Sequence, residues 1–159
     1  MVELNYVKIA RRDIGLREVK GASHAVRIVE MLHRLGAWWR DDETPWCGVA
    51  MGAWMKEAGL PYPKAYYRAL ALLDYGVACN IQYGAIAVLT RKGGGHVGIV
   101  TGMSSDGKHI RLLGGNQGDT VSEMWFPKER ITAYRMPVGI VKSIAVPLAK
   151  VGDLSVTEA

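Results

Sequence analysis

Apolar residues recur at intervals of three or four positions through the first half of the chain, which is the spacing of an amphipathic helix. A first stripe covers residues 4–14, and a wider one covers residues 26–35, with Ser23 as its N-cap. Residues 46–58 and 66–75 have the same helical character. Each of these stretches is followed by a glycine, the residue most often found just past a helix end. The pattern therefore predicts four helices.

The second half changes to short apolar and alternating segments, which are typical of strands. The prediction is an apolar run at 85–89, a glycine loop at 93–95, a hairpin turn at 105–107, and strands at 96–102, 109–113, 123–126 and 131–136. Helices followed by an antiparallel sheet indicate an α+β domain. The length of 159 residues fits one domain, which we place at residues 1–137. Residues 138–159 are then a C-terminal extension, which could be an edge strand, a docking arm or a disordered end.

The net charge of +5 favours polyanionic partners, either nucleic acid or an anionic cell-wall polymer. No basic helix, zinc-ligand pattern or interleaved surface aromatics accompanies the charge, so no nucleic-acid partner is predicted. No segment has the character of a signal peptide or the length of a membrane span. We therefore expect a protein made in the cytoplasm without stable membrane insertion, and we expect it to be a monomer.

The chain contains two cysteines, Cys47 and Cys79, which are expected to be reduced thiols because no disulfide framework surrounds them. Cys47 follows Trp46 and opens the third predicted helix. The N–H groups and partial positive charge of a helix start stabilise a thiolate. Cys47 is therefore a candidate nucleophile, against the alternative of a buried structural cysteine. Cys79 lies just after a predicted helix and is expected to serve packing alone.

His96 and Asn116 are the candidate partners of this nucleophile. His96 begins the strand after the glycine loop, where an imidazole could face a helix start and take the thiol proton. Asn116 follows the strand that should pair with it, where an amide oxygen could accept the imidazole N–H and hold one tautomer. Alone, His96 is more simply a packing or surface histidine, and Asn116 a turn residue. Together with Cys47 they form the set and the order that a cysteine hydrolase needs.

Three segments resemble a known family: residues 41–48 (DDETPWCG), residues 95–100 (GHVGIV) and residues 113–117 (LGGNQ). They are similar to CHAP-type proteins, the cysteine, histidine-dependent amidohydrolases/peptidases, and more narrowly to a phage- and prophage-encoded branch of the NlpC-type cell-wall peptidases. The similarity covers most of residues 10–137. It implies a papain-like fold, with N-terminal helices packed on a C-terminal antiparallel sheet, and cleavage of amide bonds in peptidoglycan. It also implies that Cys47 is the nucleophile, His96 the base and Asn116 the orienting residue.

One position departs from the family pattern, because many CHAP domains carry a glutamate where this chain has Gly114. The site would then work as Cys-His-Asn. The backbone N–H of Cys47 and one preceding side-chain donor, with Thr44 as the nearest candidate, would bind the oxyanion. Glu43 could contribute to the site and Trp46 could line a groove, although a solvated acidic loop and a core aromatic explain them more simply. No spaced aspartate ladder is visible, so neither a metal nor a cofactor is predicted.

The predicted function is a peptidoglycan hydrolase, either a stem-peptide endopeptidase or an N-acetylmuramoyl-L-alanine amidase. The preferred setting is a phage or prophage endolysin that acts on the cell wall after its release. A tail-associated or secreted-effector wall hydrolase would use the same chemistry. An inactive wall-binding module on the same fold is the alternative from another class, and the complete Cys-His-Asn set argues against it.

Overall fold

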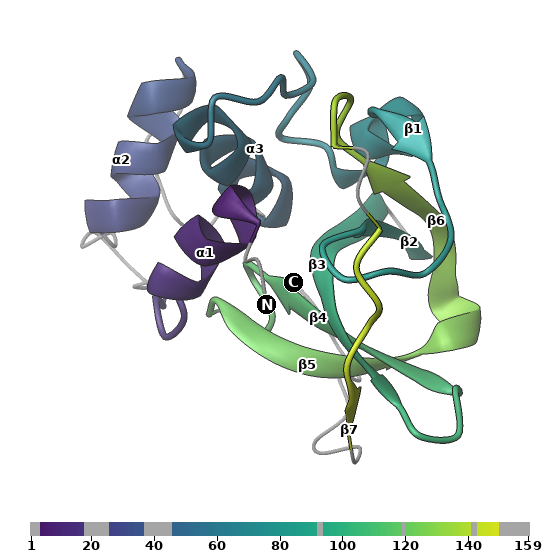
Figure 1. Ribbon diagram of the computed structural model, residues 1–159. Helices are drawn as coiled ribbons and strands as arrows, with labels where there is room; N and C mark the ends of the chain where they lie inside the picture. The colour runs from purple at the N-terminus through teal and green to yellow at the C-terminus, as the bar shows by residue number, and fades with distance from the viewer. Residues whose placement is uncertain are drawn as a thin grey trace.

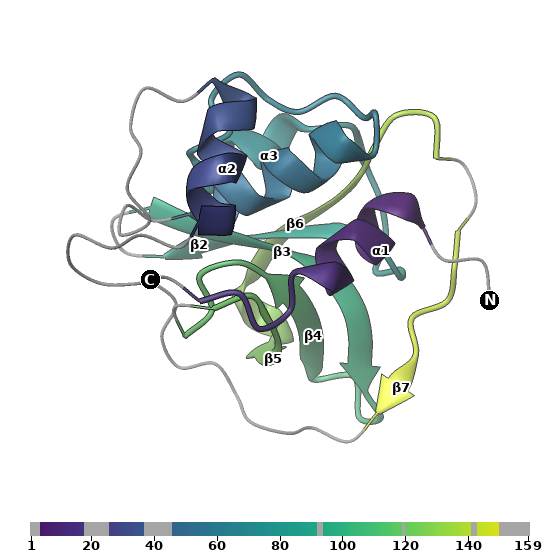
Figure 2. The ribbon, with the colours of Figure 1, turned by 90° about the vertical axis from the view of Figure 1, so that its left-hand side faces the viewer.

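The computed structural model describes residues 4–17, 26–36, 46–91, 94–118, 120–140 and 143–149. The α-helices come first in this part of the chain: α1 (Asn5–Arg12), α2 (Val26–Leu35) and α3 (Cys47–Glu57). They gather on one side of a curved sheet (Figure 1), and the view turned by 90° shows α2 and α3 above the sheet and α1 in front of it (Figure 2). Helices packed on an antiparallel sheet confirm the predicted α+β class.

The sheet is built from β1 (Val77–Ala78), β2 (Ile86–Arg91), β3 (Gly94–Ser104), β4 (His109–Gly114), β5 (Ser122–Pro127), β6 (Ile131–Met136) and β7 (Leu148–Ala149). The strands lie in the order β1-β6-β2-β3-β4-β5, and all these neighbours are antiparallel. The short strand β7 pairs with β3 in parallel. The 3₁₀ helix η1 (Ala69–Asp74) precedes β1, and the 3₁₀ helix η2 (Lys128–Arg130) connects β5 and β6. The pairing of β3 with β4 confirms the hairpin expected around residues 105–107.

The apolar run of β2 is explained by burial on both faces of the sheet. Ile86 and Val88 pack in the core beneath the helices, together with Val97 of β3. Ala87 and Leu89 point to the opposite face and pack in a second core. Successive residues of a strand alternate between faces, so a strand that is covered on both sides must be apolar at every position.

The helix predicted at residues 66–75 is confirmed only in part, because it is shorter than expected and forms as the 3₁₀ helix η1. Arg68, which precedes η1, is extended (φ −113°, ψ 114°). The backbone carbonyl of Tyr66 lies directly against Gly48 of α3, where a Cβ would overlap it. Tertiary packing of this segment onto α3 therefore overrides its local helical pattern.

The predicted glycine loop is also shorter than expected, because Gly94 and Gly95 already belong to β3 and pair with β2. Gly93 lies outside the described residues. Gly95 is closely packed, and a Cβ there would lie 2.6 Å from a methyl carbon of Leu70. His96 is consequently the third residue of β3, not the first residue of the strand.

The described part of the predicted C-terminal extension is a docked arm. The backbone N–H of Tyr83 donates to the carbonyl of Ile144, and that of Met103 donates to Pro147, both at 2.9 Å. Ile140 and Ile144 pack against the core beneath the helices. The arm ends in β7, while residues 150–159 lie outside the described part of the chain.

Asp13 joins α1, α2 and α3, a link that the sequence did not indicate. It is the C-cap of α1, accepts hydrogen bonds of 3.2 and 3.1 Å from Arg27 of α2, and accepts one of 2.9 Å from the indole of Trp54 of α3. Arg27 also donates to Glu57 of α3 at 2.6 Å. The side chains of Asp13 and Arg27 are only 12% and 23% exposed, so this pair is largely removed from water.

We expect Asp13→Ala to lower the free energy of unfolding by about 2 kcal/mol, because the change removes the acceptor of the buried Trp54 indole N–H and leaves Arg27 with Glu57 as its remaining close carboxylate. Chemical denaturation monitored by circular dichroism would measure the loss. Glu30→Ala is the matched control: Glu30 contacts the same Arg27 at 3.7 Å but is 45% exposed. Its removal should cost less than about 1 kcal/mol. Equal losses in the two variants would contradict the role assigned to Asp13.

Candidate active site

Cys47 is the first residue of α3, and its side chain is almost completely buried, with 4% of the residue exposed. Trp46 occupies the N-cap position and makes no side-chain capping hydrogen bond. The first N–H groups of a helix have no carbonyl partner within that helix, so the helix start carries a partial positive charge. This is the setting that the sequence predicts for a nucleophilic thiol. Trp46 itself is 1% exposed and belongs to the core.

The first turn of α3 packs on the end of the sheet that carries His96. Gly115, directly after β4, lies against this turn: a Cβ there would be 2.8 Å from the indole of Trp46 and 2.9 Å from the Cβ of Ala50. Ile99 pairs with Leu113, so continuing the register places Gly115 opposite Val97, the neighbour of His96. Because Gly115 has no side chain, the first turn of α3 can pack closely against it. The start of α3 therefore lies beside the end of β3 that contains Val97.

His96 is fully buried, with none of its surface exposed. Its Nε2 atom lies 2.9 Å from the side-chain Oε1 of Gln117. Its ring stacks on Phe126 of β5, with a centroid separation of 5.6 Å and an interplanar angle of 26°. A hydrogen bond at one ring nitrogen and a stacked aromatic ring together restrict the imidazole to one orientation, which a general base requires.

The residue hydrogen-bonded to His96 is Gln117, one position after the predicted Asn116. Asn116 is 1% exposed and has a φ of 59°, the left-handed conformation that asparagine adopts more readily than most residues. This turn brings Gln117 back over β4, where its amide nitrogen donates to the carbonyl of Leu112 at 3.2 Å. The catalytic role of Asn116 stays a prediction. Gln117 was missed because the sequence offers two adjacent amides and no means of choosing between them.

Two further predicted residues, Glu43 and Thr44, lie outside the described residues. Neither cysteine belongs to a disulfide. Burial raises the pKa of the Cys79 thiol, and a hydrogen bond with Gln82 and the charge of Arg135 only partly oppose that effect. A raised pKa means less thiolate at neutral pH, so Cys79 is a poor nucleophile.

In the ranges that the structure describes, no three His, Cys, Asp or Glu side chains come together in a way that could hold a metal ion. In those same ranges, no helix is long and apolar enough to span a bilayer.

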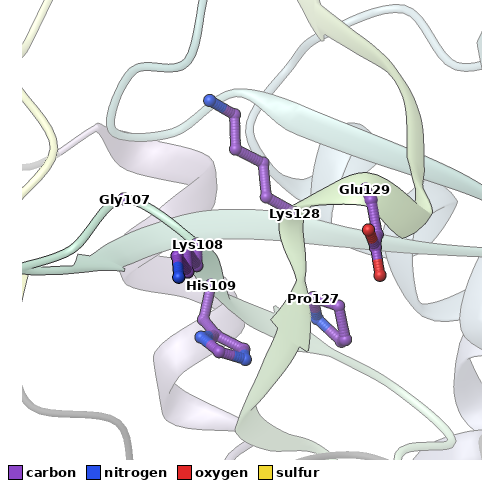
Figure 3. Close-up of a pocket in the computed structure, with 6 residues that line it drawn as sticks. All are labelled: Gly107, Lys108, His109, Pro127, Lys128 and Glu129. Atoms are coloured by element: carbon purple, nitrogen blue, oxygen red, sulfur yellow. The ribbon is translucent and has the colours of Figure 1, made fainter.

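A hollow of about 690 Å³ lies at the turn of the β3–β4 hairpin, far along β4 from the end that approaches Cys47. Figure 3 shows its lining side chains: Lys108, His109, Pro127, Lys128 and Glu129, with Gly107 at the turn. It contains a histidine but no thiol or hydroxyl nucleophile. The hollow is therefore not the candidate catalytic centre.

Comparisons with protein-family models, with curated proteins and with solved structures find no match to this chain. The α+β class rests on the structure alone. The resemblance to CHAP-type proteins stays an expectation from the three sequence segments that contain Cys47, His96 and Asn116.

Proposed function

We propose that this chain is a cysteine hydrolase of bacterial peptidoglycan with a papain-like fold. It would cleave an amide bond within the stem peptide or the bond between N-acetylmuramic acid and L-alanine. The observation that carries the proposal is the buried His96 imidazole, held by Gln117 at the end of the sheet where the helix opened by Cys47 packs. A thiol at a helix start and an oriented imidazole are the two groups that nucleophilic amide hydrolysis requires.

The substrate class comes from the resemblance of residues 41–48, 95–100 and 113–117 to CHAP-type proteins. The net charge of +5 is consistent with it, because a basic protein is attracted to an anionic wall. Within this class we propose the role of a phage or prophage endolysin, made in the cytoplasm and acting after release.

In the proposed reaction, His96 takes the proton of the Cys47 thiol, and the thiolate attacks the amide carbonyl carbon. A C–S bond forms while the carbonyl oxygen takes the negative charge, which N–H groups at the start of α3 can stabilise. The C–N bond then breaks, and the amine leaves with the proton from the His96 imidazolium. Water attacks the resulting thioester with His96 as base, which releases the carboxylic acid and restores the thiol.

Digestion of purified sacculi tests the proposal. Sacculi would be incubated with the wild type and with Cys47→Ala, and the soluble fragments would be analysed by mass spectrometry. We expect fragments from the wild type alone. Release of intact stem peptides would identify an amidase, and cleaved stem peptides would identify an endopeptidase.

Intact sacculi after incubation with a folded wild-type protein would contradict the enzymatic function. Co-sedimentation of the protein with those sacculi would then favour the inactive wall-binding module. Equal fragment yields from the wild type and Cys47→Ala would support a hydrolase but would show that Cys47 is not its nucleophile.

A further inference from the structure

We propose that Gln117 is the positioning residue of His96, and that Gly98 and Gly114 together form the cradle that holds its side chain. The cradle is defined by these two glycines. The catalytic meaning of this inference rests on the proposed function, whereas the state of the His96 ring that it specifies can be measured without any substrate.

The orientation of the Gln117 carboxamide follows from its hydrogen bonds. Its nitrogen lies 3.2 Å from the carbonyl oxygen of Leu112 and 2.8 Å from that of Ser122. Carbonyl oxygens accept hydrogen bonds and cannot donate them, so the NH₂ group must face these two atoms. The opposite orientation would place the amide oxygen against two carbonyl oxygens. Oε1 is therefore the atom that faces His96.

This orientation fixes the tautomer of the imidazole. Because Oε1 can only accept, the hydrogen of this bond must be carried by Nε2 of His96. A neutral imidazole has one ring hydrogen, so Nδ1 keeps its lone pair and is the basic nitrogen. The amide carries no net charge, and it orients the ring without adding a negative charge to the buried site.

The cradle explains how a long side chain fits there. A Cβ at position 114 would lie 2.6 Å from Oε1 of Gln117 and 3.1 Å from the carbonyl oxygen of Val97. A Cβ at Gly98, on the same face of β3 as His96, would lie 3.5 Å from Oε1. Gln117 is 1% exposed and its amide nitrogen is bonded to the carbonyls of Leu112 and Ser122, so the carboxamide cannot shift without disturbing these hydrogen bonds. A side chain at position 114 would therefore push the amide away from His96.

Nitrogen NMR of the full chain labelled with ¹⁵N-histidine tests the tautomer directly. The His96 signals would be assigned by their loss in His96→Gln and followed by pH titration into the range where the ring is neutral. We expect a protonated Nε2 and an unprotonated Nδ1 in the wild type. In Gln117→Met, which keeps the length of the side chain but not its acceptor, the two nitrogens should move toward averaged shifts.

A neutral His96 with the hydrogen on Nδ1 in the wild type would overturn the inference, as would an unchanged tautomer in a folded Gln117→Met. Both outcomes are independent of activity. A fixed Nε2–H tautomer in a protein that leaves sacculi intact would contradict the proposed function and leave the role of Gln117 in place.

The same inference predicts that positions 114 and 117 are coupled. Gly114→Ala should lower kcat by about 10²-fold or more with little change in KM, as Gln117→Ala should, because both remove the support of the general base. The kcat of the double variant should be no lower than that of Gln117→Ala, since the added methyl group then no longer meets the carboxamide. Independent, multiplying losses in a folded double variant would show that the cradle does not act through Gln117.

Discussion

Cys47→Ser should lower kcat/KM on a soluble muropeptide by about 10³-fold or more, while the protein keeps its fold. Serine replaces sulfur by oxygen in a residue that is 4% exposed, so packing at the start of α3 changes little. The chemical change is large, because a hydroxyl group has a far higher pKa than a thiol, and the proposed mechanism requires His96 to deprotonate residue 47. Chromatographic separation of substrate and products gives the rate, and circular dichroism checks the fold.

Cys79→Ser is the matched control, because it makes the same atomic change at the other cysteine and should retain wild-type activity. The two variants also allow each thiol to be alkylated separately. With iodoacetamide near neutral pH, Cys47 should react faster than Cys79, because burial raises the pKa of the Cys79 thiol. Faster labelling of Cys79, or full activity of Cys47→Ser, would contradict the assignment of the nucleophile.

The elements that could be predicted from the sequence are those that local chemistry determines. The helices ending before Gly15, Gly36 and Gly59 form as expected, and all three glycines have positive φ values. The segment at residues 66–75 could not be predicted in the same way. Its apolar spacing is helical, but its backbone is held against Gly48 by a contact with α3 that is remote in sequence.

In the candidate site, too, local sequence predicts some residues, while others depend on contacts that are remote in sequence. Cys47 and His96 were identified because each begins, or nearly begins, a predictable element. Gly114 stands where many CHAP domains, which three segments of this chain resemble, carry a glutamate. The structure fills the space beside Gly114 with the Gln117 carboxamide, which arrives through the left-handed turn at Asn116. Neither the turn nor the direction of the following side chain can be deduced from spacing along the strands.

Gly48→Ala should lower the free energy of unfolding by about 3 kcal/mol, although alanine favours helices more than glycine does. Gly48 is the second residue of α3, and an added Cβ would overlap the carbonyl oxygen of Tyr66 and lie 3.5 Å from the backbone nitrogen of Ala69. Both neighbours are backbone atoms, which cannot rotate away as the tip of a side chain can. For a domain of this size, such a loss lowers Tm by roughly 6–12 °C.

Gly52→Ala separates this contact from the change in helix propensity, because Gly52 lies one turn further along the same buried helix. Its added Cβ would meet only side-chain atoms, 3.2 Å from the Cβ of Tyr66 and 3.5 Å from a methyl carbon of Leu35. The Leu35 methyl groups can shift, so Gly52→Ala should have a much smaller effect on thermal unfolding. Equal Tm values for the two variants would show that the segment before η1 is not held against α3. A lower Tm in Gly48→Ala alone would confirm the contact. If this variant also hydrolysed the substrate more slowly at temperatures where it remains folded, the same backbone contact would be needed to position Cys47.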